Sequence, residues 1–243
     1  MIRFLKNQIP MQAEIRRCWL FTFQVPEREV RSLIPNPIEL VTHRHFAFWN
    51  VVVARMGSMR PQGVPALFGM DYWHVGYRLY TRVKRAEGDF EGLSFLRSDC
   101  DQTLLTLAGN LFTDFCFHTS RIQVQESGTQ SSIHIHSNTA KGEAFLDTAA
   151  VVQLPIHSAF DSLEEAEAFL KYKPCGISGQ GPDAVSVVRI RRDEDAWRSK
   201  PVAVLHQEWA FLKPFQGLQP ELCFEVAPIH YQFGRGQRLE GLL

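Results

Sequence analysis

The clearest alternation of apolar and polar positions lies at residues 72–83, YWHVGYRLYTRV. One parity reads Trp, Val, Tyr, Leu, Thr, Val, and the other reads Tyr, His, Gly, Arg, Tyr, Arg. The pattern predicts a β-strand, because successive side chains point to opposite faces of a sheet. If the second face meets solvent, His74 and Arg78 are ordinary surface residues. If it lines the inside of a closed sheet, they are polar groups of a binding site.

Other segments rich in aromatic and β-branched residues predict further strands. Two of them, separated by the turn sequence ESGTQ, predict a hairpin, and residues 84–92 predict the turn of another. The segments are 18–25, 45–56, 93–99, 115–125, 131–137, 185–191, 201–210 and 221–233.

Helices are predicted over residues 26–34, 99–112 and 161–172. Asp101 is expected to cap the second helix, and Asp161 or Ser162 the third, because their side chains can accept a hydrogen bond from a free amide of the first turn. The glycine- and proline-rich stretch 173–183 predicts a loop.

Many strands, few helices and no regular βαβ alternation favour an α+β fold built on a closed antiparallel sheet. The 243 residues contain no repeat or linker, so we expect one domain over residues 1–243. With 26 basic and 26 acidic residues, the formal net charge is zero, which argues against a nucleic-acid or anionic-lipid partner.

No apolar run is long enough for a transmembrane helix, and the first residues lack the apolar core of a signal peptide. The five cysteines show no CxxC spacing, which favours a reduced, cytoplasmic protein.

A metal site is one alternative for the histidines of the chain. His134 and His136 lie two positions apart on one predicted strand face, and Glu143 could add a carboxylate, as in metal-binding double-stranded barrels. The spacing to Glu143 is long, however, and no second half-motif follows. Because Ile133 and Ile135 alternate with these histidines, a solvent-facing strand explains them better. We therefore predict no metal and no cofactor.

The order of four segments resembles the YqjF-like family of uncharacterised conserved proteins, a branch of the acetoacetate decarboxylase-like superfamily. The segments are CWLFTFQVPEREVRSLIP, GYRLYTRV followed by EGLSFLRSD, SLEEAEAFLKY, and VAVLHQEWAFL, and they cover about residues 18–212. The resemblance implies a mainly antiparallel, cone-shaped β-barrel with a few short helices and a central cavity. It also implies assembly into a homo-oligomer.

The decarboxylases of that superfamily use a lysine as a Schiff-base nucleophile beside a second lysine. The resemblance places Phe117 and His118 at the positions of this pair, and His74 at the position of an assisting glutamate. Acetoacetate decarboxylase chemistry is therefore not expected.

The resemblance also implies that alternate strand residues line the cavity, which would bring His74 and Arg78 inside. We expect Arg78 to bind the carboxylate of a small organic acid or keto compound, with Trp73 and Tyr80 contacting its body. His74 and His118 would then serve as acid and base. A non-catalytic protein that binds or senses a small molecule is the alternative, and the metal-dependent barrel a distant third.

Overall fold

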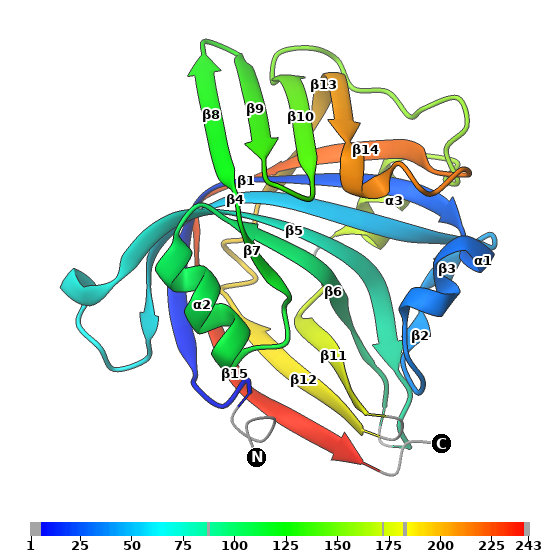
Figure 1. Ribbon diagram of the computed structural model, residues 1–243. Coiled ribbons are helices and arrows are strands. Elements are labelled where there is room, and N and C mark those ends of the chain that lie inside the picture. The colour runs from blue at the N-terminus through cyan, green and yellow to red at the C-terminus, as the bar shows by residue number, and fades with distance from the viewer. Residues whose placement is uncertain (1–5, 87, 172, 182–183, 241–243) are drawn as a thin grey trace.

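The computed structural model describes residues 6–86, 88–171, 173–181 and 184–240 (Figure 1). Its helices are short, and its 3-10 turns are shorter still. The helices are α1 (Glu27–Val30), α2 (Thr103–Phe112) and α3 (Leu163–Leu170), and the 3-10 turns are η2 (Arg31–Leu33), η3 (Ala66–Phe68) and η4 (Ala210–Leu212).

The strands carry most of the fold. In chain order they are β1 (Met11–Pro26), β2 (Glu39–Leu40), β3 (Thr42–His43), β4 (Phe46–Pro61), β5 (Met70–Val83), β6 (Phe90–Cys100), β7 (Phe117–Thr119), β8 (Arg121–Ser127), β9 (Gln130–His136), β10 (Lys141–Asp147), β11 (Cys175–Gly181), β12 (Ala184–Arg191), β13 (Ser199–Trp209), β14 (Gln219–Val226) and β15 (Ile229–Glu240).

Seven strands pair in a closed ring, in the order β1, β4, β5, β6, β11, β12, β15 and back to β1. All of these pairs are antiparallel except β6 with β11. The expected mainly antiparallel α+β fold with a few short helices is confirmed. The expected strand at 72–83 is confirmed as part of β5, and the hairpin around ESGTQ as β8 and β9.

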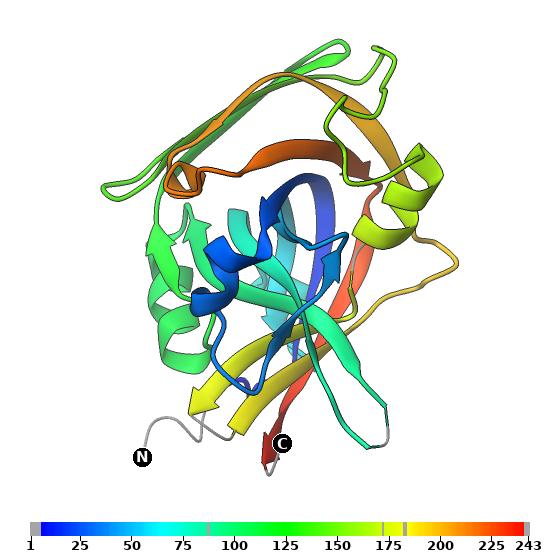
Figure 2. The ribbon, with the colours of Figure 1, turned by 90° about the vertical axis from the view of Figure 1, so that its right-hand side faces the viewer.

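A second layer branches from the ring at β1. The long β1 pairs with β15 through its first half and with β14 through its second half. From β14 the sheet continues through β13, β10, β9 and β8. Figures 1 and 2 show this layer arching over one side of the ring.

The two layers explain why apolar side chains occupy both faces of the ring strands. One core lies between the layers and includes Trp19, Trp49 and Tyr77. The other lies on the opposite face of these strands and includes Leu20, Phe48 and Tyr80. Strand β5 therefore contributes to both cores with alternate residues.

The stretch 173–183, expected as a loop, instead holds strand β11 up to Gly181, and residues 182–183 lie outside the described residues. One of its glycines fits a narrow space. A Cβ on Gly179 would lie 2.6 Å from the Pro35 ring, whereas one on Gly176 would be in ordinary contact with Phe115 at 3.4 Å. Glycine at position 179 allows close packing against β11 and does not mark a turn.

Helix α3 begins at the predicted cap, Ser162, whose hydroxyl accepts a hydrogen bond from Glu165 N at 3.1 Å. The Glu165 carboxylate reaches back to Asp161 N at 2.8 Å, a variant of the capping box. Helix α2 differs from the prediction. Its N-cap is Gln102, and the Asp101 carboxylate accepts from Trp73 N in β5.

Replacing Ser162 with alanine is expected to lower the free energy of unfolding by about 1 kcal/mol, because a first-turn amide of α3 loses its acceptor. Urea denaturation measures the change. Ser199→Ala, at an exposed position of β13, is the control and should leave stability nearly unchanged. Equal behaviour of the two variants would refute a stabilising role for this cap.

Candidate functional site

A cavity of 410 Å³ opens on the inner face of the ring. Strands β1, β4, β5 and β15 line it, together with β6, β12 and helix α2. Most of the lining is aliphatic, aromatic or methionine. Its polar side chains among the described residues are Asn7, Arg60, Tyr72, His74, Arg78, Thr113 and Tyr231.

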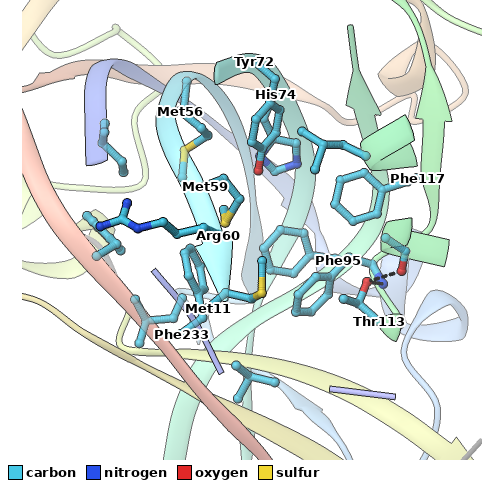
Figure 3. Close-up of a pocket in the computed structure, with 18 of the residues that line it drawn as sticks. Met11, Met56, Met59, Arg60, Tyr72, His74, Phe95, Thr113, Phe117 and Phe233 are labelled. Atoms are coloured by element: carbon cyan, nitrogen blue, oxygen red, sulfur yellow. Dashed lines mark hydrogen bonds between the residues drawn. The ribbon is translucent and has the colours of Figure 1, made fainter. Parts of the chain in front are cut away.

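Strand β5 turns its polar parity toward this space. Tyr72, His74 and Arg78 line the cavity, whereas Val75 and Tyr77 enter the core between the layers. The face that sequence alone could assign either to solvent or to a cavity therefore faces the cavity. Figure 3 shows His74 and Tyr72 beside Phe117, with Met56 and Met59 directed into the same space.

Arg78 is 6% exposed and lies at the inner end of the lining part of β5. Its Nη2 donates a hydrogen bond to Asn50 Oδ1 of the neighbouring strand β4. The guanidinium also lies 5.4 Å from the centre of the Phe95 ring, a cation–π contact. Asn50 and Phe95 thus hold a permanently charged, planar group at the base of an apolar cavity.

His74 lies four residues before Arg78 on β5, nearer the mouth and between aromatic rings. Its ring centre is 5.8 Å from that of Phe117 and 6.5 Å from that of Phe95. Among the described residues its Nε2 has no hydrogen-bond partner. Burial, aided by the positive charge of Arg78, lowers the pKa of His74 to about 3. The imidazole is therefore neutral at physiological pH, and one of its nitrogens can donate a hydrogen bond while the other accepts one.

This low pKa makes stability depend on pH. In the unfolded chain a histidine binds a proton below about pH 6.5, whereas the folded protein keeps His74 neutral down to about pH 3. The unfolded state thus binds more protons in that window, and stability falls as the pH falls through it. We expect wild type to lose about 1–2 kcal/mol more than His74→Leu between pH 7.5 and 5. Urea denaturation at the two pH values measures this, and the exposed His134→Leu serves as the control. Parallel losses in wild type and His74→Leu would contradict it.

Tyr80 lies on the same face of β5 as Arg78, but it contributes to the site through Asn50. Its hydroxyl donates to Leu170 O at 2.6 Å and accepts from Asn50 Nδ2 at 3.0 Å. It fixes the same Asn50 that binds Arg78. Tyr80 does not itself line the cavity among the described residues.

Trp73 and His118 lie apart from the cavity, which corrects the expected grouping of site residues. Trp73 belongs to the other parity of β5 and stacks on Trp19 at 6.3 Å between ring centres. His118 is exposed, and strand β7 pairs it with Asp99 of β6. Its neighbour Phe117 points into the cavity, so alternation directs His118 to the opposite face.

The residues of the metal alternative lie on the second layer. The register places Glu143 opposite His134, but it places His136 opposite Lys141. Instead, His206 of β13 donates or accepts a hydrogen bond with Glu143 at 2.9 Å. Glu143, His206 and Glu208 hold ligand atoms within 4.8 Å of one another. This group is separate from the cavity, and Glu208 forms an ion pair with Lys213.

The sequence pattern did not predict two residues of the site, Asn50 and Arg60. Asn50 is the single polar residue within the apolar run 46–54 of β4, and its 1% exposure shows that it had to find buried partners. That isolation was the available signal. Arg60 reaches the cavity from the outer end of β4, where no pattern marked it.

Known structures place this architecture in the acetoacetate decarboxylase-like fold. An acetoacetate decarboxylase-like enzyme from Sphingomonas wittichii RW1 matches with a TM-score of 0.63 and 10% identity, over 97% of this chain and 94% of that one. Acetoacetate decarboxylase from Legionella pneumophila matches with a TM-score of 0.64 and 12% identity, over 97% and 90%. The enduracididine biosynthesis enzyme MppR, complexed with pyruvate, matches with a TM-score of 0.57 and 10% identity, over 95% and 90%.

The sequence is assigned more narrowly. The model of the DUF2071 family of uncharacterised conserved proteins matches residues 12–228, and the chain belongs to that family. No curated protein matches it. The fold implied by the resemblance to the acetoacetate decarboxylase-like superfamily, drawn from the order of sequence segments, is confirmed. Among the described residues, no helix combines the length and the apolar character needed to span a membrane.

Proposed function

We propose that the cavity binds a small organic carboxylate or keto compound. The observation that carries this is the placement of Arg78, a buried guanidinium held by Asn50 at the base of an apolar cavity. A carboxylate there receives charge-assisted hydrogen bonds in a low-dielectric setting, where they are strong. Neutral His74 adds a hydrogen-bond donor or acceptor for a keto or hydroxyl oxygen.

The charges of the lining support this ligand class. Among the described residues that line the cavity are two arginines and one histidine, but no aspartate, glutamate or lysine. An anion thus meets no fixed negative charge in the lining. The same set supports a function without a Schiff-base lysine. The MppR structure that holds pyruvate has a similar fold, which also supports a small keto acid as ligand.

Binding without catalysis is the second candidate, and the state of His74 favours it. A histidine with a pKa of about 3 is a weak base, and at neutral pH it holds no proton to donate as an acid. His118, the other expected acid–base residue, lies on the opposite face of the sheet. Any conversion of the ligand would thus rely on His74 and Arg78, because no other histidine lines the cavity among the described residues.

Three further expectations stay part of the proposal. The chain forms one domain over residues 1–243, acts in the cytoplasm and assembles into a homo-oligomer. Its ligand is a small molecule and not a nucleic acid or a membrane, which the balance of 26 basic and 26 acidic residues supports.

Thermal unfolding against a panel of carboxylates, keto acids and uncharged analogues tests the binding site. A ligand at a hundred times its dissociation constant adds about 2.7 kcal/mol to stability and should raise the midpoint by several degrees. We expect carboxylate-selective shifts in wild type and their loss in Arg78→Met. Arg82→Met is the matched control, because Arg82 lies on the same strand but binds Glu39. Shifts that survive in Arg78→Met would refute the assignment of the anion site.

Product analysis of the ligands that shift the midpoint then separates the two candidates. Conversion that exceeds one turnover per protein supports an enzyme, whereas saturable binding without conversion supports a carrier or sensor. Borohydride treatment in the presence of a keto acid adds a direct check. A covalent adduct on any lysine would overturn the proposal that no Schiff base forms.

A further inference from the structure

We propose that the ligand is an amphipathic monocarboxylate, with its carboxylate at Arg78 and a long apolar tail that extends toward the cavity mouth. This inference rests on the proposed function and specifies its ligand class. It follows from the size of the cavity, from the uneven distribution of polar groups along it, and from the contacts of its second arginine.

The cavity is larger than the smallest keto acids require. Its 410 Å³ falls within the range of roughly 300–1,000 Å³ found for pockets that enclose drug-sized ligands. A four-carbon keto acid would leave much of the apolar lining in contact with water, whereas a ligand of about the size of decanoate covers more of it.

The cavity is also elongated and polarised. Its exposed lining residues mark the mouth: Ile9, Phe68 and Phe112 are 40%, 66% and 37% exposed. Arg78, at 6%, marks the closed end. On β5 the lining runs from Met70 near the mouth to Arg78, eight positions or about 26 Å of strand. A charged head and an apolar tail match these two ends.

Four methionines line the part of the cavity nearer the mouth. Met11, Met56 and Met59 (Figure 3) and Met70 contribute from β1, β4 and β5. Unbranched, polarisable thioethers adapt to apolar groups of different shape. This half of the cavity therefore suits a flexible alkyl or aryl tail better than a second polar group.

The second arginine does not create a second anion site. Arg60 donates through Nε to Val64 O at 2.9 Å and through Nη1 to Ser58 O at 2.7 Å. A further bond joins Nη1 to Ser58 Oγ at 2.9 Å. Ser58 of β4 and Val64 of the loop that follows thus bind this guanidinium at the mouth. The cavity therefore binds one anionic group, at Arg78.

A chain-length series tests the inference. Isothermal titration calorimetry with butanoate, hexanoate, octanoate, decanoate and tetradecanoate, all below their micelle concentrations, measures each dissociation constant. We expect affinity to rise roughly three- to fourfold for each added methylene and then to level off beyond decanoate. The matched alkanols should bind at least tenfold more weakly than the alkanoates.

Variants at the mouth locate the tail. Met59→Asp, at a partly buried position of β4, is expected to weaken decanoate at least tenfold and to leave butanoate within twofold. Met59→Leu is the matched control and should retain both affinities. Arg78→Met should weaken the whole alkanoate series by a similar factor and leave the alkanols unchanged.

The outcomes separate this inference from the proposal beneath it. Carboxylate binding that depends on Arg78 but not on chain length would overturn the long-tailed ligand and leave the proposed function standing. Equal binding of alkanols and alkanoates would overturn the placement of the head group. Absence of binding by every carboxylate, short or long, would overturn both.

Discussion

Replacing Asp99 with alanine is expected to lower the free energy of unfolding by about 3–5 kcal/mol, the usual effect of removing one partner from a buried ion pair. Asp99 is fully buried in β6, and Arg97, two residues before it, is 5% exposed. The pair is bidentate, with Arg97 Nη2 at 2.7 Å from Asp99 Oδ1 and Nε at 3.0 Å from Oδ2. Ser120 donates a third bond to the carboxylate at 2.7 Å.

This pair also joins the ring to the second layer. Arg97 donates to Ser137 Oγ at 3.1 Å and to Thr139 Oγ1 at 2.9 Å, in the turn between β9 and β10. Without Asp99, the partners left to the buried guanidinium among these residues would be the hydroxyl groups of Ser137 and Thr139. The attachment of the β9–β10 hairpin to β6 would weaken as a result.

Urea denaturation of wild type and Asp99→Ala measures the effect. Asp89→Ala, at an exposed position just before β6, is the control and should change stability by less than about 0.5 kcal/mol. The double variant Arg97→Met, Asp99→Leu should be more stable than Asp99→Ala, because it buries no unpaired charge. A loss below 1 kcal/mol in Asp99→Ala would show that the pair contributes little.

The apolar pattern of the sequence predicted most strands of the ring, with β11 the exception, but it could not orient their faces. Alternation in 72–83 correctly predicted a strand, yet its two faces are both buried, one against the second layer and one around the cavity. In an ordinary solvated sheet the polar face would mark the outside. Here Tyr72, His74 and Arg78 line a cavity, and only long-range pairing determines this.

Errors in the predicted site have equally specific causes. The side that His118 faces depends on where β7 begins, and the chain enters β7 through Cys116, which has a positive φ of 52°. No periodicity in the sequence shows such a bend. Asp101 is of a residue type that often caps helices, but its carboxylate accepts a hydrogen bond from the backbone amide of Trp73, 28 residues earlier in β5. Local propensity competes here with a tertiary hydrogen bond, and the tertiary bond wins.

The last expected result concerns the ring itself. Its weakest described link is the pairing of β6 with β11, which is parallel and joins only Gly176 to Leu93 and Ile177 to Ser94. Gly92 lies beside this link, and a Cβ there would be 2.5 Å from the Cys175 carbonyl oxygen. Because that atom belongs to the backbone, the strands must separate to admit a side chain.

Gly92→Ala is therefore expected to destabilise the protein by about 3 kcal/mol, at the upper end of overpacking effects. Gly176→Ala is the matched control on the partner strand, where the nearest atom, in Phe115, lies at 3.4 Å. That change should be neutral or slightly stabilising, because alanine restricts the unfolded chain. Urea midpoints at equal slope separate the two variants. Phe95 lies on β6 just past the link and lines the cavity, so opening this link should also weaken any ligand held at Arg78. Equal stability of the two variants would mean that the ring does not depend on close contact at this point.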